Sequence, residues 1–160
     1  MQSVTILCIG KLKEAYLTDG CAEYLKRLGA YCKARVVELP ESRLPDQPSP
    51  RQIQQALEEE GKELLAKIPA GAWVAALCIE GRQISSPGLA GLIEEAGLQG
   101  RSSLVFVIGG SWGLSDEVKR RAQLRLSLSE MTFPHQLARM LLLEQLYRAY
   151  SILYHGKYHK

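Results

Sequence analysis

The sequence lacks both a long apolar run and a cysteine pattern typical of a metal site. No window approaches the roughly 18 continuous apolar residues of a membrane span. The N-terminus has no charged region followed by an apolar core, so no secretion signal is predicted. The four cysteines, Cys8, Cys21, Cys32 and Cys78, include no C-x-x-C pair and no histidine at zinc spacing. We therefore expect a cytoplasmic protein with reduced thiols, no metal and no membrane contact.

The chain also has little excess of either charge. Twenty lysines and arginines stand against seventeen acidic residues, which leaves a net charge of +3. This balance permits a polyanionic partner but does not require one. With 46% apolar residues in 160, the chain can bury a core of its own. We expect a single domain that covers residues 1–160.

Short apolar runs alternate with helical patterns along most of the sequence. The predicted strands are 4–9, 35–39, 73–79, 104–108 and 124–128. The predicted helices between them are 16–28, 53–68, 88–96 and one that begins at Ser115; Ser49 and Pro50 suit the cap and first turn of the second. Alternation of this kind predicts an α/β fold with a mainly parallel five-stranded sheet that is covered on both faces.

The last predicted helix, 135–154, has apolar residues on more than one side. A helix buried on several sides in a small domain often packs against its own sheet and against a second subunit. We therefore predict a homodimer with this helix at the interface; a central core helix in a monomer is the alternative. The proline-rich segment 40–50 is interpreted as a mobile flap rather than a domain linker.

Two loops that follow strands predict one ligand site. The first contains Gly109, Gly110 and Gly113, and the second is the segment 129–134, which offers hydroxyls, main-chain donors and apolar side chains. Because ligands of open α/β sheets gather at the carboxyl ends of strands, both loops and the strand end at 77–81 could line one site. The glycines match neither G-x-x-x-x-G-K-[ST] nor G-x-G-x-x-G, and the first strand carries no dinucleotide fingerprint, which weighs against a nicotinamide oxidoreductase.

Four longer motifs point to a known family. FVIGGSWGLS, LSLSEMTFPHQLARMLLLEQLYRAY, the terminal KYHK and the early IGKLKE together resemble the SPOUT methyltransferases of the ribosomal RNA large subunit methyltransferase H family. The resemblance covers nearly the whole chain. It implies an enzyme that uses S-adenosyl-L-methionine to methylate N3 of a pseudouridine in helix 69 of 23S ribosomal RNA. It also implies a C-terminal trefoil knot and a homodimer whose interface carries the active sites.

The same resemblance assigns roles to individual residues. It implies that the cofactor is held by two strand ends and the second loop: Leu77, Gly109, Gly110, Leu128, Ser129, Glu130, Met131, Thr132, Phe133 and Pro134. It implies that the tail with Tyr158 and His159 reaches a site near the partner subunit's cofactor. Ser111 and Trp112 occupy variable family positions, so the resemblance gives Trp112 no role.

Methylation of an imino nitrogen requires that its proton leave, so a general base or an ordered water is expected. The candidates are His159 and His135. We favour His159 because a tail residue can approach RNA, whereas His135 at a helix start could simply cap or orient its loop. Arg148 is predicted either to contact an RNA phosphate or to orient the tail. A basic run after the first loop, Lys119, Arg120, Arg121 and Arg125, is interpreted as a solvated face.

The expected substrate is 23S ribosomal RNA within the assembled large subunit or the 70S ribosome. A chain without a separate RNA-binding domain and with a modest charge is poorly equipped to bind free RNA tightly. The alternative function is a non-catalytic RNA-binding or ribosome-associated dimer of the same fold. Release of S-adenosylhomocysteine in the presence of ribosomes would separate the two functions.

Overall fold

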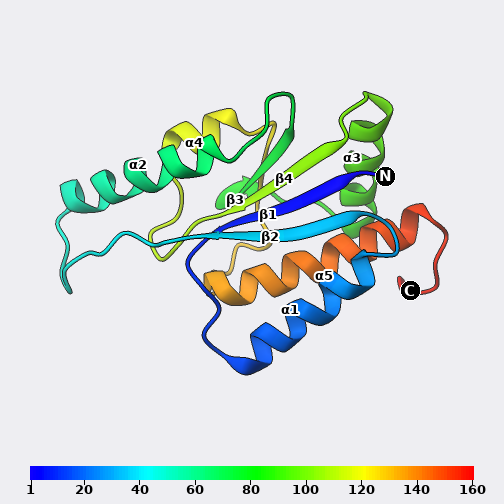
Figure 1. Cartoon of the computed structure of the whole chain (residues 1–160), viewed down its shortest axis with the longest axis horizontal. Coiled ribbons are helices and arrows are strands. Elements are labelled where there is room, and N and C mark those ends of the chain that lie inside the picture. Colours follow the sequence, from blue (N-terminus) through cyan, green and yellow to red (C-terminus); the bar gives the residue numbers. More distant parts are fainter.

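A single parallel sheet lies between two layers of helices in the computed structural model, which describes residues 1–160 (Figure 1). The strands are β1 (Ser3–Ile9), β2 (Lys33–Leu39), β3 (Trp73–Arg82), β4 (Ser103–Ile108) and β5 (Leu124–Leu126). The helices are α1 (Ala15–Leu28), α2 (Pro50–Ala66), α3 (Ser86–Leu98), α4 (Asp116–Arg121) and α5 (His135–Leu153). The predicted α/β class, five strands and five helices are confirmed.

The sheet has the order β2-β1-β4-β3-β5, and every neighbouring pair is parallel. The sequence predicted a mainly parallel sheet, and the observed one is entirely so. Strands β1 and β4 pair inside the sheet, with a register that runs from Ser3 opposite Ser103 to Cys8 opposite Ile108. The edges of the sheet are β2 and the short strand β5, and a cavity lies beside β5.

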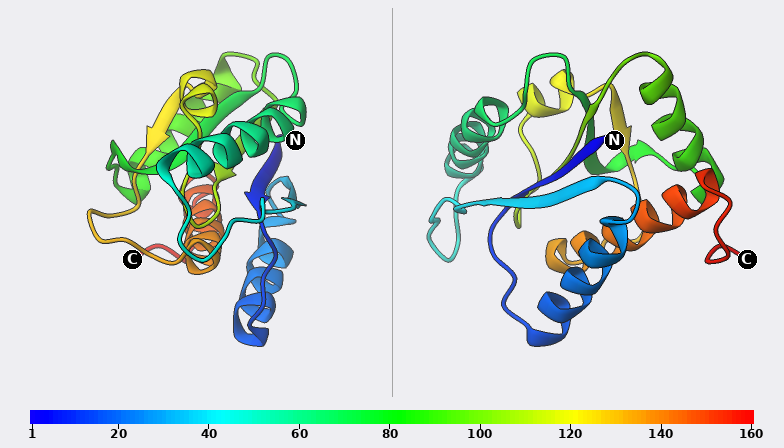
Figure 2. Two further views of the ribbon diagram at one scale, coloured as in Figure 1. Left: turned by 90° about the vertical axis from the view of Figure 1, so that its left-hand side faces the viewer. Right: turned by 45° about the vertical axis from the view of Figure 1, so that its right-hand side comes forward.

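Alternating residues of the strands fill two separate cores. On β1, Val4, Ile6 and Cys8 face the core that contains α1, α3 and α5. Leu7 and Ile9 face the opposite core with α2 and α4. Figure 2 shows these helices as layers on the two faces of the sheet. Burial on both faces explains why the strand runs are almost continuously apolar.

The structure corrects the predicted boundaries of β2, β3 and β5. Strand β2 begins at Lys33 rather than at residue 35. Strand β5 ends at Leu126 rather than at residue 128, because Ser127 Oγ donates a hydrogen bond to the Ser129 carbonyl and the chain turns there. Strand β3 continues past the predicted end at residue 79 to Arg82, beyond a register shift after Leu77. The predicted cap of α2 is confirmed, since Ser49 accepts a hydrogen bond from Gln52 N and Gln52 bonds back in a capping box. The helix spans Pro50–Ala66 rather than residues 53–68.

The proline-rich segment has no regular structure, but its beginning is anchored. Ser42 N donates a hydrogen bond of 2.8 Å to Glu60 Oε2 on α2. The Glu60 side chain is only 6% exposed, and this burial raises the pKa of its carboxyl. Glu41 accepts hydrogen bonds from the loop after β4. The flap interpretation therefore does not describe Glu41 and Ser42, and motion of the later residues stays a prediction.

Arg139 connects three elements beneath the start of α5. It is 2% exposed; its Nη1 lies 2.5 Å from Glu38 Oε2 on β2, and its Nη2 donates to the Gly10 carbonyl at 3.1 Å. We expect Arg139→Met to lower the free energy of unfolding in a urea titration by about 3 kcal/mol, because Glu38 and Gly10 lose their partner. Arg27→Met, which breaks the exposed Arg27–Glu23 pair and the contacts of Arg27 with the Tyr24 and Tyr147 rings, should cost about 1 kcal/mol. Equal losses would contradict a structural role for Arg139.

Candidate functional site

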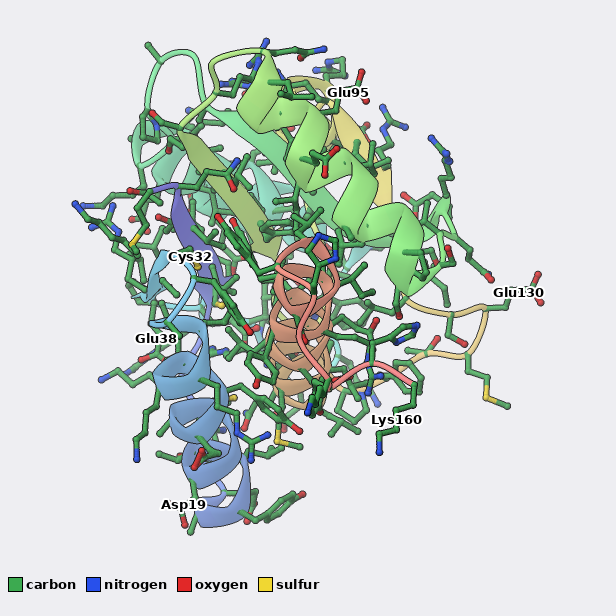
Figure 3. All side chains as sticks on the ribbon, turned by 90° about the vertical axis from the view of Figure 1, so that its right-hand side faces the viewer. Asp19, Cys32, Glu38, Glu95, Glu130 and Lys160 are labelled. Carbon is green, nitrogen blue, oxygen red and sulfur yellow. The ribbon has the colours of Figure 1, made fainter.

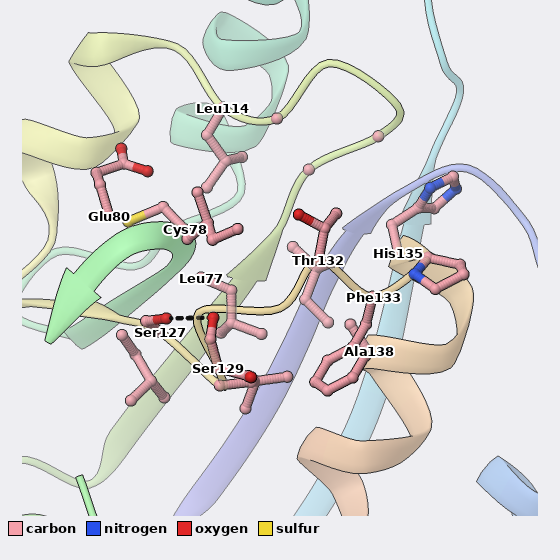
Figure 4. Close-up of a pocket in the computed structure, with 18 of the residues that line it drawn as sticks. Leu77, Cys78, Glu80, Leu114, Ser127, Ser129, Thr132, Phe133, His135 and Ala138 are labelled. Atoms are coloured by element: carbon pink, nitrogen blue, oxygen red, sulfur yellow. Dashed lines mark hydrogen bonds between the residues drawn. The ribbon is translucent and has the colours of Figure 1, made fainter. Parts of the chain in front are cut away.

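A cavity of about 700 Å³ opens at the carboxyl ends of β3, β4 and β5 (Figure 4). Its volume lies in the range of small-molecule sites. Half of its lining residues are hydrophobic, and much of its polar surface comes from loops. The lining consists of Leu77, Cys78, Ile79, Glu80, Ile108, Gly109, Gly110, Ser111, Trp112, Gly113, Leu114, Lys119, Leu126, Ser127, Leu128, Ser129, Met131, Thr132, Phe133, Pro134, His135 and Ala138.

The glycine loop 109–113 forms one wall of the cavity and is tightly folded. Gly113 N donates to the Gly110 carbonyl at 3.1 Å, and the two residues form an isolated bridge. A Cβ at Gly109 would overlap the main chain of Gly113, so this position has no room for any side chain. Gly113 has φ +87°, which favours glycine. At its three glycines the loop therefore brings main chain to the cavity, and Ser111 and Trp112 are its residues with side chains there.

The loop does not resemble a phosphate-binding loop in its electrostatics. Ser111 N donates to Glu41 Oε2 at 2.9 Å, and Ser111 Oγ lies 3.4 Å from the same oxygen. A carboxylate of the protein that lies outside the cavity thus takes the Ser111 amide, so this donor is not free to bind a phosphate in the cavity. This arrangement agrees with the absence of a dinucleotide fingerprint and disfavours the oxidoreductase alternative.

The second loop forms the facing wall. Ser129 Oγ accepts a hydrogen bond of 3.0 Å from Met131 N, which closes a local turn. Nine of the ten residues that the family resemblance assigned to the cofactor line the cavity. Glu130 does not: it is exposed, and Figure 3 shows its side chain on the outside of the loop. Any contact that Glu130 makes inside the cavity would have to use its main chain.

An ion pair that the sequence did not predict stands at the rim of the cavity. Lys119 Nζ on α4 lies 2.5 Å from Glu80 Oε1 at the end of β3, and both residues line the cavity. The hydrogen bond from Lys119 is the main reason that the pKa of Glu80 is lowered. Interpretation of the basic run as solvated is therefore wrong for Lys119, whose side chain is 19% exposed. It is also wrong for the half-buried Arg121, whose Nη2 donates to the Ala72 carbonyl, and it holds for the exposed Arg120 and Arg125.

The sequence did not decide the roles of two residues, His135 and Trp112. His135 is the first residue of α5 and lines the cavity, with its Nε2 3.9 Å from the position that a Cβ of Gly10 would take. It does not act as a side-chain cap, since the cap residue is Pro134. Trp112 is 54% exposed and lines both this cavity and a neighbouring hollow of about 240 Å³.

The tail candidates form a cluster of their own. Arg148 Nη1 lies 3.1 Å from His159 Nδ1, and its guanidinium lies over the Tyr158 ring at 4.7 Å. Arg148 Nε also donates to Glu144 Oε2 at 3.2 Å. Tyr158 packs edge to face on Tyr147, with ring centroids 4.7 Å apart. These contacts hold the tail against α5 in this chain, and both roles weighed for Arg148 stay predictions.

The structure does not bring the tail cluster to the cavity within one chain. His135 and Arg148 are thirteen residues apart on α5, which corresponds to roughly 20 Å along the helix. None of Arg148, Tyr158 and His159 lines the cavity. Figure 1 shows the C-terminus beyond the end of α5 that lies far from the second loop. Only His135 among the four catalytic candidates therefore stands at the cavity of its own chain.

The structure contains neither a metal-binding cluster nor a membrane-spanning helix. No group of three or more His, Cys, Asp or Glu side chains is arranged to hold a metal ion. No helix has both the length and the apolar character that crossing a membrane requires.

The sequence is similar over nearly its whole length to proteins of one family. A family model described as "Predicted SPOUT methyltransferase" matches residues 2–159. A relative from Exiguobacterium sibiricum is 49% identical over 98% of this chain and 99% of its own length. A relative from Carboxydothermus hydrogenoformans is 46% identical with the same coverage of both chains. Both relatives are named ribosomal RNA large subunit methyltransferase H.

Solved structures share the fold at much lower identity. A probable methyltransferase from Bordetella pertussis Tohama I aligns with a TM-score of 0.54 at 15% identity, over 93% of this chain and 96% of that one. A probable methylase family protein from Haemophilus influenzae aligns with a TM-score of 0.51 at 14% identity, over 98% of this chain and 70% of that one. At such identities the likeness concerns the fold alone.

Proposed function

The chain belongs to the SPOUT methyltransferases and, among them, to the ribosomal RNA large subunit methyltransferase H family, and from this premise we propose its reaction. Methyl transfer to ribosomal RNA follows from the membership. In the finer proposal, the methyl donor is S-adenosyl-L-methionine and the acceptor is N3 of a pseudouridine in 23S ribosomal RNA. The observation that carries the proposal is the cavity between two main-chain loops, at the position where the family motifs lie.

The cavity has the size and chemical character that this cofactor needs. Leu77, Leu114 and Phe133 offer apolar surface to a flat ring, and the two loops offer main-chain donors and acceptors to its polar ends. When bound, the cofactor supplies an activated methyl group on a sulfonium. The loops 109–113 and 127–134 would hold and orient it and exclude water. In a displacement reaction such alignment can contribute about 7 kcal/mol or more.

The acceptor nitrogen carries a proton, so a base is needed beside the cavity. We propose His159 for this role, with Arg148 and Tyr158 orienting it; His135 is the alternative. Because the tail lies roughly 20 Å along α5 from the cavity of its own chain, we propose that a second subunit supplies it. The dimer places the tail of one protomer at the cavity of its partner. The half-buried Leu141 and Tyr147 on α5 are suited to such an interface.

We propose that the substrate is the assembled large subunit or the 70S ribosome in the cytoplasm. The net charge of +3 gives little nonspecific attraction for phosphate. Outside the cavity, exposed lysines and arginines such as Arg120, Arg125 and Lys160 are available for contact with a preformed RNA surface.

The proposal is tested by titration and by a methylation assay. The protein is expected to have twice the mass of the 17.8 kDa chain in solution and to bind one S-adenosylmethionine per chain with micromolar affinity. Ribosomes should be methylated with release of S-adenosylhomocysteine, whereas ribosomes that lack pseudouridine should not. Cofactor binding without methylation of any ribosomal substrate would favour the non-catalytic alternative. Equal methylation of a naked RNA fragment would refute recognition of the assembled particle.

A further inference from the structure

A residue from the proline-rich segment holds the glycine loop, although seventy positions separate them in sequence. Glu41 Oε2 accepts from Ser111 N at 2.9 Å and lies 3.4 Å from Ser111 Oγ. Gly110 and Gly113 pair with each other through their main chains. The hydrogen bonds that join the loop to a side chain outside it both go to Glu41. One carboxylate therefore provides both side-chain hydrogen bonds to this loop.

The same carboxylate fills the space behind the loop. A Cβ at Gly110 would overlap Glu41 Oε2 and would lie 3.1 Å from Ile9 Cγ2. Gly110 therefore has the cavity on one side and Glu41 and Ile9 on the other. Close packing of this kind leaves the loop no room to move backwards as long as Glu41 stays in place.

Glu41 is itself held from both directions. Before it, the Leu39 carbonyl accepts a hydrogen bond of 2.7 Å from Gly10 N. After it, Ser42 N donates to the buried carboxylate of Glu60 at 2.8 Å. Helix α2, which carries Glu60, packs against the start of α4, since a Cβ at Gly61 would overlap Ser115 Oγ. Glu41 is exposed to solvent, but the main chain on both sides of it is held in place, and this directs its side chain toward the loop.

We propose that Glu41 is a positioning residue. It holds the loop 109–113 in the shape that cofactor binding requires, and it does not contact the cofactor itself. Glu41 does not line the cavity, so its effect passes through Ser111 and Gly110. The inference rests on the proposed function for the identity of the ligand. Its structural part, that the carboxylate fixes the loop, stands independently of that ligand.

The test compares three variants in the full-length protein. Glu41→Ala removes the acceptor, Glu41→Gln keeps an oxygen that can accept from Ser111 N, and Asp46→Ala removes an exposed acid from the same segment. We expect Glu41→Ala to weaken S-adenosylmethionine binding and raise its KM by about tenfold, in line with loss of a charged hydrogen bond. At saturating cofactor, kcat should stay within about threefold, because the reacting groups are untouched. Glu41→Gln should restore most of the affinity, and Asp46→Ala should bind like the wild type.

A second measurement needs no cofactor. Hydrogen exchange at the Ser111 amide of the ligand-free protein should become at least about tenfold faster in Glu41→Ala and remain unchanged in Asp46→Ala. If the wild type binds no S-adenosylmethionine, the proposed function fails, and this exchange rate still tests the role of Glu41. If the Ser111 amide of Glu41→Ala exchanges at the same rate as in the wild type, the inference is overturned. Wild-type cofactor affinity in that variant, or a Glu41→Gln variant as defective as Glu41→Ala, would also overturn it.

Discussion

Replacement of Gly109 by alanine is expected to weaken S-adenosylmethionine binding by roughly a hundredfold, which corresponds to about 2.7 kcal/mol. The added Cβ would overlap the Gly113 main chain, and a main-chain group cannot move aside as a side chain can. Relief of the overlap would require opening of the Gly110–Gly113 bridge, and this would change the wall of the cavity. Isothermal titration at one temperature measures the effect directly.

The matched control is Gly91→Ala, which makes the same chemical change on α3. A Cβ at Gly91 meets nothing within 4 Å, so this variant should bind the cofactor normally. It should also be slightly more stable, by about 0.5–1 kcal/mol, because alanine is the better helix former. Normal binding by Gly109→Ala would mean that the loop shape is not needed for the cofactor.

Replacement of His159 by glutamine is expected to lower kcat by roughly a hundredfold and to leave cofactor affinity within about threefold. The structure adds a condition to its proposed role as a base. Arginine can only donate, so the contact of Arg148 Nη1 with His159 Nδ1 makes Nδ1 the acceptor, and a neutral ring then carries its hydrogen on Nε2. His159 must therefore leave Arg148, or exchange its hydrogen, before it can take a proton.

Two further variants separate the possible roles. If Arg148 and His159 act as a unit, Arg148→Met should lower kcat, and the double variant with His159→Gln should lose little more than the single ones. His135→Gln provides the comparison at the cavity. A large loss of kcat in His135→Gln together with a wild-type rate in His159→Gln would assign the proton transfer to His135.

The parts of the molecule that sequence patterns predicted well are those in which one physical rule dominates. Strands buried on both faces give continuous apolar runs, such as 104–108, and both the number and the parallel arrangement of strands followed from these runs and the helices between them. Ser49 and Pro50 marked the start of α2 because few residue types satisfy a helix end. The apolar runs also located the carboxyl ends of the strands, beside which ligands of such sheets bind. The cavity lies at the ends of β3, β4 and β5.

The missed features depend on contacts between distant segments. No pattern around Glu41 or Lys119 indicates that one meets Ser111 and the other meets Glu80, because such pairs arise only when the sheet is assembled. The end of β5 was missed because Ser127 bonds to the Ser129 carbonyl and turns the chain in spite of the strand-like residues there. The knot came from family resemblance alone, whereas the dimer was also predicted from the apolar residues on several sides of the last helix; both stay predictions.

The order of the strands also sets a limit on how the protein folds. Strand β1 pairs with β4, and Ser3 lies opposite Ser103, so the central pairing closes a loop of about a hundred residues. Contacts of such long separation make folding slow, since the entropy of closing the loop is lost before the contacts compensate for it. During synthesis one edge of β1 stays open until β4 has been made, and a shortened chain would keep that edge exposed to aggregation. The ligand cavity, which needs β3, β4, β5 and the start of α5 together, is consequently a property of the complete chain and not of any early folding unit.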